Sequence, residues 1–395
     1  MATQRDLDLI RASAAGDVER MRSLLGRGAK VNTRLKNGAT PLLAAAVGGH
    51  MDAAQLLIVQ GADLKARYKN DATVLIMAAT QGREAIVRLL LQKGANINER
   101  TGGGVTALLA ASIEGHASVV EALLGSRADA NAADERGVTP LIGAAVNGHM
   151  EVVCALIASG AEVNAKSHSG LTAISASIAA TPAVAWVLLE KGADPNTVDE
   201  NGRPVLVAAA ANGNAEILPM LLERGAALEA HDGSGTTAFI AATLGGHVDA
   251  LKFLLERSAN VNASGPSGVT PLIAAVVRGH SEVMELLLNS GADLNIATTD
   301  GVTALMAAVN SNPAAVPVLL DRGADLNAAD KGGITALHAA AAMDKLDLVR
   351  LLVERGADPG RVTAKGLTPL AVAETAGHAG IVEFLRAGSG NGSPG

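Results

Sequence analysis

One spacing constrains this sequence more than any other feature: a glycine recurs about every 33 residues along almost the whole chain. The members of the series are Gly38, Gly104, Gly137, Gly170, Gly202, Gly235, Gly268, Gly301, Gly333 and Gly366. Asp71 occupies the one place without glycine, and two steps, Gly170 to Gly202 and Gly301 to Gly333, are one residue short. A fixed period of this length indicates stacked repeats that each contact their neighbours, rather than two or three globular domains.

The segment 137–165, GVTPLIGAAVNGHMEVVCALIASGAEVNA, shows what one repeat contains. Thr139 can accept an orphan backbone N–H and Pro140 suits the first helical position, so a helix is predicted to begin there. Gly148 ends this helix, and Gly160 ends a second one. The apolar stripe of the second helix is Val152, Val153, Leu156 and Ile157. Each repeat is therefore predicted to be a pair of antiparallel helices whose apolar faces need a neighbour to cover them.

The repeated motifs identify a family resemblance. They are TPLLAAAVGGH at 40–50, TPLIGAAVNGH at 139–149, TPLIAAVVRGH at 270–280 and TALHAAA at 335–341. In these motifs and in its period the chain resembles ankyrin-repeat proteins over nearly its whole length, with about twelve repeats. The resemblance implies an all-α repeat solenoid of antiparallel helix pairs joined by β-hairpin-like loops.

We expect the repeat array to cover residues 1–387, followed by a disordered Gly/Ser tail at 388–395. Residues 1–37 are predicted to form an N-terminal cap repeat, because their opening helix is more polar than its counterparts, and the chain is expected to start near its natural beginning. Residues 363–387 are predicted to form the C-terminal repeat.

A longer period of 131 residues, as between Gly104 and Gly235, suggests that a block at 101–231 was duplicated to give 232–362. Irregularities recur at the same spacing. Pro182 and Pro313 stand at the inter-helix turns of the sixth and tenth repeats, and Arg127 and Ser258 stand at the exit glycine of the fourth and eighth. We expect Thr181 and Asn312 to cap the helices that follow these prolines. The alternative to duplication is chance resemblance among similar repeats.

Composition excludes several classes of protein. The only cysteine, Cys154, rules out an internal disulfide and is interpreted as a small core residue. No run of 18 apolar residues occurs, so membrane insertion and export are not expected. We expect an intracellular location instead, with the cytoplasm favoured over the nucleus. The formal charge of −7 argues against specific nucleic-acid binding.

No pattern predicts catalysis, a metal site or a cofactor. The two G-x-G-x-x-A matches, at 102–107 and 233–238, fall in register with the repeat, so they are interpreted as turns rather than dinucleotide sites. Each Gly-His histidine belongs to a different repeat, and stacked helices lie about 8–10 Å apart. We therefore expect hydrogen bonds at the inter-helix turns instead of shared metal ions. This set comprises His50, His116, His149, His247, His280 and His378.

The ankyrin resemblance implies binding through the concave face, formed by hairpin tips and the exposed side of each first helix. The first hairpin tips carry Arg34, Lys36, Arg67, Tyr68, Lys69 and Arg100. Tyr and Arg are common anchors of interfaces, so these residues are a candidate site for an acidic partner segment. The alternative is a solvated charged face. The first helices offer Glu114, Asn147 and Arg278 as further polar contacts.

The position after each leading glycine is repeatedly apolar. The residues are Val105, Val138, Leu171, Val269, Val302, Ile334 and Leu367. This strip has two interpretations, packing against the neighbouring hairpin or gripping a peptide, and packing is favoured.

The sequence therefore predicts a non-catalytic adaptor or scaffold that binds protein partners. A second hypothesis is a regulatory or inhibitory subunit that occludes an enzyme or a transcription factor. A third, of a different class, is an enzyme or a ligand-binding protein.

Overall fold

The computed structural model describes residues 3–389, except the side chains of residues 179, 180, 266, 388 and 389. Within this range the chain forms 24 α-helices and no strand, apart from an isolated bridge between His231 and Thr237. The chain divides into two compact units, unit 1 at Met1–Asn201 and unit 2 at Gly202–Gly395. Each unit is a stack of helix pairs, which confirms the predicted all-α repeat solenoid.

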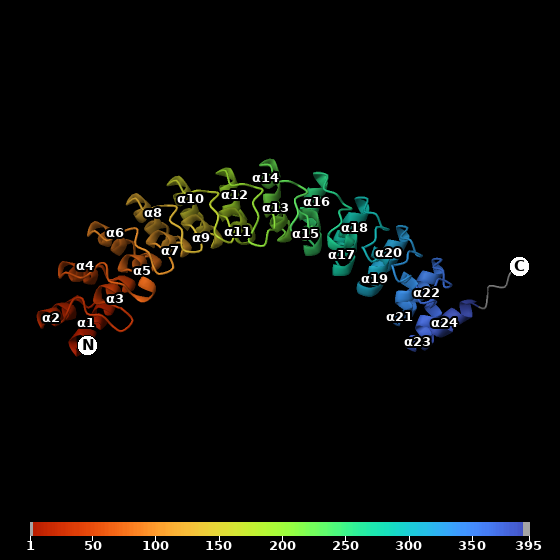
Figure 1. The fold of residues 1–395 in the computed structure, drawn as a ribbon, viewed down its shortest axis with the longest axis horizontal. Coiled ribbons are helices and arrows are strands. Elements are labelled where there is room, and N and C mark those ends of the chain that lie inside the picture. The colour runs from red at the N-terminus through yellow and green to blue at the C-terminus, as the bar shows by residue number, and fades with distance from the viewer. Residues whose placement is uncertain (1–2, 390–395) are drawn as a thin grey trace. The chain divides into compact units, whose positions relative to one another are not determined.

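Unit 1 holds the first six helix pairs. They are α1 Gln4–Ala15, α2 Val18–Gly26, α3 Pro41–Gly48, α4 Met51–Val59, α5 Val74–Thr80, α6 Glu84–Gln92, α7 Ala107–Ile113, α8 Ala117–Gly125, α9 Pro140–Val146, α10 Met150–Ala158, α11 Ala173–Ala180 and α12 Pro182–Glu190, with a 3₁₀ turn at Lys69–Asp71. The odd-numbered first helices of this unit line its inner side and the even-numbered second helices its outer side (Figure 1).

Unit 2 holds the other six pairs, arranged in the same way (Figure 1). They are α13 Val205–Ala211, α14 Leu218–Glu223, α15 Ala238–Gly245, α16 Val248–Glu256, α17 Pro271–Arg278, α18 Ser281–Asn289, α19 Ala304–Ser311, α20 Ala315–Asp321, α21 Ala336–Ala342, α22 Leu346–Glu354, α23 Pro369–Ala376 and α24 Ala379–Ser389, with 3₁₀ turns at Ala215–Ile217 and Pro266–Gly268.

The helix starts predicted from threonine are confirmed. The Thr139 hydroxyl accepts a hydrogen bond from the Ile142 N–H at 3.3 Å, and Pro140 is the first residue of α9. The same bond recurs at the first helices of other repeats, for example from Leu43 to Thr40 at 3.2 Å. One orphan donor of the helix terminus is thereby satisfied in each case.

The Gly-His histidines form hydrogen bonds at the inter-helix turns, as predicted, and their partners lie in the preceding repeat. His149 Nε2 lies 2.9 Å from the carbonyl oxygen of Ile113, at the end of the preceding first helix. The remaining pairs are His50–Ala14, His116–Thr80, His247–Ala211, His280–Leu244 and His378–Ala342, at 2.9–3.2 Å. Arg83 and Lys345 replace histidine in two repeats and reach the equivalent carbonyls of Val47 and Val309. A donor at this turn satisfies a carbonyl that the first helix leaves open at its C-terminus.

Several non-glycine residues adopt the left-handed conformation that the repeat requires. Asp71, at the vacant place in the glycine series, has a φ of 60°. Arg127 and Ser258, at the exit-glycine positions of the fourth and eighth repeats, have φ values of 65° and 63°. The repeat geometry is therefore kept at these places despite a steric cost of about 1–2 kcal/mol per residue.

The prediction that Cys154 belongs to the core is wrong, because its side chain is exposed. On α10 the buried residues are Val152, Val153 and Leu156. One helical step of about 100° beyond Val153 carries Cys154 out of this stripe.

The two proline-containing turns differ from each other. Pro182 is the first residue of α12, as predicted, but the Thr181 side chain caps nothing and its hydroxyl is buried without a partner. Asn312 does not cap α20, which begins only at Ala315. The Asn312 carbonyl instead accepts a hydrogen bond from the Ala315 N–H at 2.9 Å, so a turn precedes the helix.

At the C-terminus, α24 continues to Ser389, two residues into the segment expected to be a disordered tail. Residues 390–395, which make up the rest of that expected tail, lie outside the described residues. The cap repeat and the duplicated blocks remain predictions.

Candidate functional site

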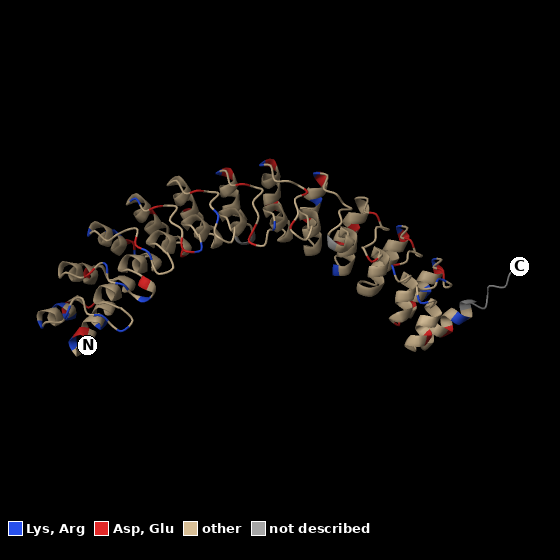
Figure 2. Ribbon diagram, in the orientation of Figure 1, with Lys and Arg blue, Asp and Glu red and all other residues tan. Residues whose placement is uncertain are grey.

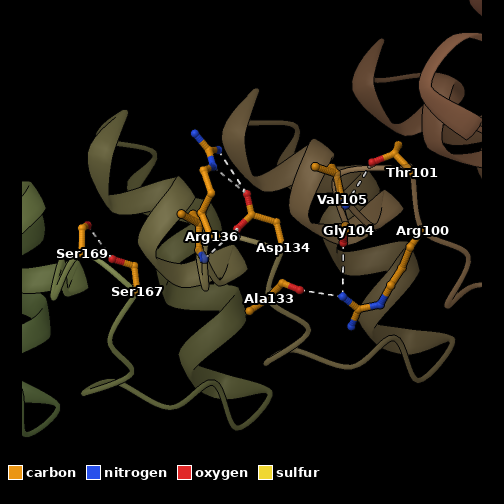
Figure 3. Close-up of polar contacts among 10 residues, drawn as sticks. Arg100, Thr101, Gly104, Val105, Ala133, Asp134, Arg136, Ser167 and Ser169 are labelled. Carbon is orange, nitrogen blue, oxygen red and sulfur yellow. Dashed lines mark hydrogen bonds and ion pairs between the residues drawn. The ribbon is translucent and has the colours of Figure 1, made fainter.

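Three arginines of the predicted N-terminal patch are engaged inside unit 1. Arg34 forms an ion pair with Asp63 at 3.1 Å. Arg67 pairs with Glu99 and also donates to the carbonyl of Arg100 in the next repeat. Arg100 repeats this arrangement by donating to the carbonyl of Ala133 at 2.6 Å (Figure 3).

These guanidinium groups lie where one hairpin meets the next. The backbone joins the same hairpins, since the Glu135 N–H donates to the Gly103 carbonyl at 3.1 Å. Within the following hairpin, the buried Asp134 carboxylate binds Arg136 and its backbone N–H (Figure 3). Arg67 and Arg100 therefore connect consecutive repeats, which commits much of their hydrogen-bonding capacity within the chain.

Lys36, Tyr68 and Lys69 are the members of the patch that stay available. Both lysine side chains are exposed and Tyr68 is half-buried. Tyr68 lines two adjoining hollows of about 330 and 620 Å³, one shared with Val47 and the other with Lys69. The structure thus brings an aromatic ring and a cation together at the second hairpin of unit 1, next to Asp71.

The predicted polar contacts of the first helices are exposed. Glu114 and Asn147 follow the last turns of α7 and α9, and Arg278 ends α17. The Asn147 side chain donates to the carbonyl of Gly143 at 3.1 Å, so part of it is already used within its own helix.

A large hollow lies in unit 2. This apolar groove has a volume of about 1050 Å³ and extends over the first helices and hairpins from α15 to α23. Its lining includes the large apolar side chains of Leu244, Val277, Met306, Ile334, Met343 and Leu367. Five of them are also exposed large apolar residues, with exposed fractions from 36% for Leu367 to 48% for Val277. Large apolar side chains clustered at the surface are typical of binding sites.

The charges on this groove are few and mostly positive. Helices α15, α17, α19 and α21 carry a single Lys, Arg, Asp or Glu residue, Arg278, and their ribbons are almost entirely tan in Figure 2. Lys365 lines the groove from the hairpin of the twelfth repeat. The one acidic lining residue, Asp330, accepts hydrogen bonds from the N–H groups of Gly332 and Ile334, both at 2.8 Å.

His338 lies under the groove and is 1% exposed. Its Nε2 is 3.0 Å from the Leu367 carbonyl, and its Nδ1 is 2.9 Å from the Thr335 hydroxyl. Burial lowers the pKa of His338 below its ordinary value, and hydrogen bonds to the backbone of Leu367 and Arg361 and the charge of Asp330 oppose this shift without reversing it. The neutral ring therefore links the floor of the groove to its last hairpin.

The apolar hairpin strip is not uniform. Val105, Val138 and Leu171 in unit 1 are half-buried, as are Val269 and Val302 in unit 2, whereas Ile334 and Leu367 are exposed on the groove. Packing therefore accounts for the half-buried members, whereas peptide binding by the exposed Ile334 and Leu367 remains a prediction. Sequence reasoning overlooked Leu244, Val277 and Met343, which stand on the exposed side of the first helices, because only polar residues were sought there.

Two other kinds of site were sought among the described residues. No group of three or more His, Cys, Asp or Glu side chains is placed to hold a metal ion. None of the helices at 3–389 combines the length and the apolar character needed to cross a bilayer.

Comparison with known families agrees with this architecture. Sequence models described as "Ankyrin repeats (3 copies)" match residues 9–101, 98–167, 173–265 and 263–330, and one described as "Ankyrin repeats (many copies)" matches 319–373. The chain belongs to the ankyrin-repeat family. Ankyrin repeats are generally protein–protein interaction modules and are typically non-catalytic. A search of curated proteins gives no match to this ankyrin-repeat chain.

Proposed function

We propose that this ankyrin-repeat protein is a non-catalytic adaptor or scaffold that binds protein partners, and that the apolar groove of unit 2 is its main contact surface. One observation carries the proposal. Of the ten large apolar side chains that are most exposed among the described residues, five line this one groove. Their burial against a partner would remove apolar surface from water, at roughly 25 cal/mol per Å².

The N-terminal patch is proposed as a second and smaller contact. Because Arg34, Arg67 and Arg100 are engaged with neighbouring repeats, the contact would depend on Tyr68, Lys36 and Lys69. Aromatic anchors beside cations are favoured in interfaces, so an acidic segment remains the partner proposed for this patch.

The proposal is tested with a groove variant, Met343→Asn together with Leu367→Thr. Each new residue is the one found 131 positions earlier, at Asn212 and Thr236, so both suit a repeat of this kind. Full-length wild-type and variant chains would be used to capture proteins from a lysate, with quantitation by mass spectrometry. Partners of the groove should be lost from the variant.

A matched control removes exposed apolar surface elsewhere. Val59 is 70% exposed at the end of α4 in unit 1, and Gln92 holds the equivalent position one repeat later. Val59→Gln should capture the same proteins as wild type. Capture of the same proteins in the same amounts by all three chains would overturn the groove as the contact surface.

The runner-up function is a regulatory subunit that occludes an enzyme or a transcription factor. It would be supported if a captured partner is an enzyme whose activity falls when the wild-type chain is added and recovers with the groove variant.

A further inference from the structure

The groove of unit 2 is not a property shared by every ankyrin repeat of this chain. Residues 131 positions apart occupy equivalent places, and four positions of the groove exchange a polar side chain for a large apolar one. Ser175, Arg203 and Asn212 correspond to Met306, Ile334 and Met343, and Thr236 corresponds to Leu367. Leu244 and Val277 correspond to the apolar Ile113 and Val146, so the later repeats add four large apolar side chains to a surface that is already apolar in part.

The charges change along with the apolar residues. Asn147 corresponds to Arg278, and Ser234 corresponds to Lys365. Both cations line the groove and are exposed, and no hydrogen bond or ion pair of either side chain is found among the described residues. The only acidic lining residue, Asp330, already receives two backbone N–H groups. The groove therefore offers two cations that are unpaired within the described part of the chain, from the ninth and twelfth repeats, against one carboxylate that is bound within its own hairpin.

The extent of the groove favours a chain segment over a small molecule. Its volume of about 1050 Å³ lies at the upper limit of ordinary ligand pockets, which hold roughly 300–1,000 Å³. It also continues across five successive repeats, from Leu244 to Val372. With neighbouring helices packed about 8–10 Å apart, several side chains of an extended or helical segment are needed to cover it.

We propose that the groove binds a linear protein segment whose apolar side chains cover Val277, Ile334 and Met343 and whose flanking carboxylates pair with Arg278 and Lys365. This inference rests on the proposed function and specifies the chemistry of the partner. The apolar residues supply affinity, while the two ion pairs set orientation and accelerate association.

The test uses a display library of random peptides about sixteen residues long as the probe. Peptides are selected on the full-length wild-type chain after removal of those that bind the groove variant Met343→Asn, Leu367→Thr. The retained sequences should share an apolar centre with Asp or Glu on its flanks. Their binding to purified wild type should weaken as salt is raised, because the ion pairs are exposed to solvent at the rim.

The cations are tested by Arg278→Asn with Lys365→Ser, which introduces the residues of the equivalent earlier positions. This variant should bind the selected peptides about threefold to tenfold more weakly and lose most of the salt dependence. The control Lys36→Ser, in the first hairpin of unit 1, should leave their affinity unchanged. Thermal unfolding of each variant shows whether the fold is intact.

The results that would overturn the inference are distinct from failure of the proposed function. Selected peptides without acidic flanks, or with Lys and Arg in their place, show a different partner chemistry while the groove remains a binding surface. No enrichment of any peptide shows that the occupant is not a linear segment. Self-association of wild type that the groove variant abolishes, seen by sedimentation, would identify the occupant as a second copy of this chain and would also overturn it.

Discussion

At the scale of single residues, His338 has the smallest exposed fraction, 1%, of the ionisable side chains that the structure describes. The Leu367 carbonyl can only accept, so Nε2 must carry a proton, and Nδ1 of the neutral ring is left to accept from Thr335. A second proton on Nδ1 would remove that acceptor from a buried site. The lowered pKa of His338 follows from burial of a ring that is stable only when neutral.

We predict that His338 makes the protein less stable as the pH falls through about 6.5, the ordinary pKa of histidine. Its pKa is lowered in the folded state, so below this pH the unfolded chain binds a proton that the folded chain does not. The contribution of the neutral His338 to the free energy of unfolding is fully present above about pH 6.5. It declines on acidification, by at most about 1.4 kcal/mol per pH unit.

This prediction is checked by urea unfolding between pH 5 and 8 with wild type and His338→Ile. Isoleucine occupies the equivalent buried position at Ile142, Ile240 and Ile273, so the variant should fold. Its stability should depend less on pH than that of wild type. Parallel pH profiles for the two proteins would contradict the assignment, whatever the difference in their absolute stability.

At the scale of elements, the turn between the two helices of a repeat decides how that repeat contacts the preceding one. Most turns contain a glycine with positive φ followed by a side chain that reaches back to a carbonyl, as His149 does to Ile113. The α11–α12 turn is one residue shorter, and Thr181 stands at the position that His149 holds in the preceding repeat. The Thr181 side chain packs against Gly148, where an added Cβ would lie 2.7 Å from its methyl carbon, and its hydroxyl finds no partner.

We predict that Thr181→Val stabilises the protein by about 1 kcal/mol, because it keeps the shape of the side chain and removes a buried hydroxyl that has no hydrogen bond. Thr172→Val is the matched control at the start of the same helix pair. The Thr172 hydroxyl accepts from the Ser175 N–H at 3.2 Å, so its loss should destabilise by about 1 kcal/mol. Urea midpoints measure both, and a lower midpoint for Thr181→Val would show that its hydroxyl is satisfied in solution.

At the scale of the whole molecule, each helix pair depends mainly on its immediate neighbours. Within unit 2, α21 contacts α19, α22 and α23, and within unit 1, α5 contacts α3, α6 and α7. Stability in such arrays is approximately a sum of repeat terms and nearest-neighbour terms. A local loss of packing should therefore remain local.

We predict that Leu352→Ala, a cavity-forming change at a fully buried residue of α22, accelerates amide exchange in α20–α24 and leaves α3–α6 unchanged. Hydrogen exchange followed by mass spectrometry resolves the two regions. Leu57→Ala in α4 is the reciprocal control, with the effect expected in unit 1. Equal acceleration along the whole chain would show that the repeats unfold as one cooperative body.

Most of the fold could be predicted because its signals are local. Thr139 and Pro140 start α9, and Gly148, which follows this helix, has a positive φ. Even Asp71 adopts the left-handed conformation that its place in the glycine series requires. These preferences arise from a few consecutive residues, so they are readable without knowledge of neighbours. The failures at Cys154 and Asn312 were also local, a misassigned helix face and a misplaced helix start.

The sequence by itself determined the period, the helix pairs and the family, because backbone preferences and apolar spacing act within one repeat. Only the tertiary structure decided what the surface residues do. Arg67 and Arg100 became links between hairpins because their partners lie about one repeat further along the chain. Leu244, Val277, Met306, Ile334 and Leu367 became one groove because stacking brings residues from five repeats to the same face. Neither outcome can be read from one repeat, since each depends on which side chains of other repeats come within reach.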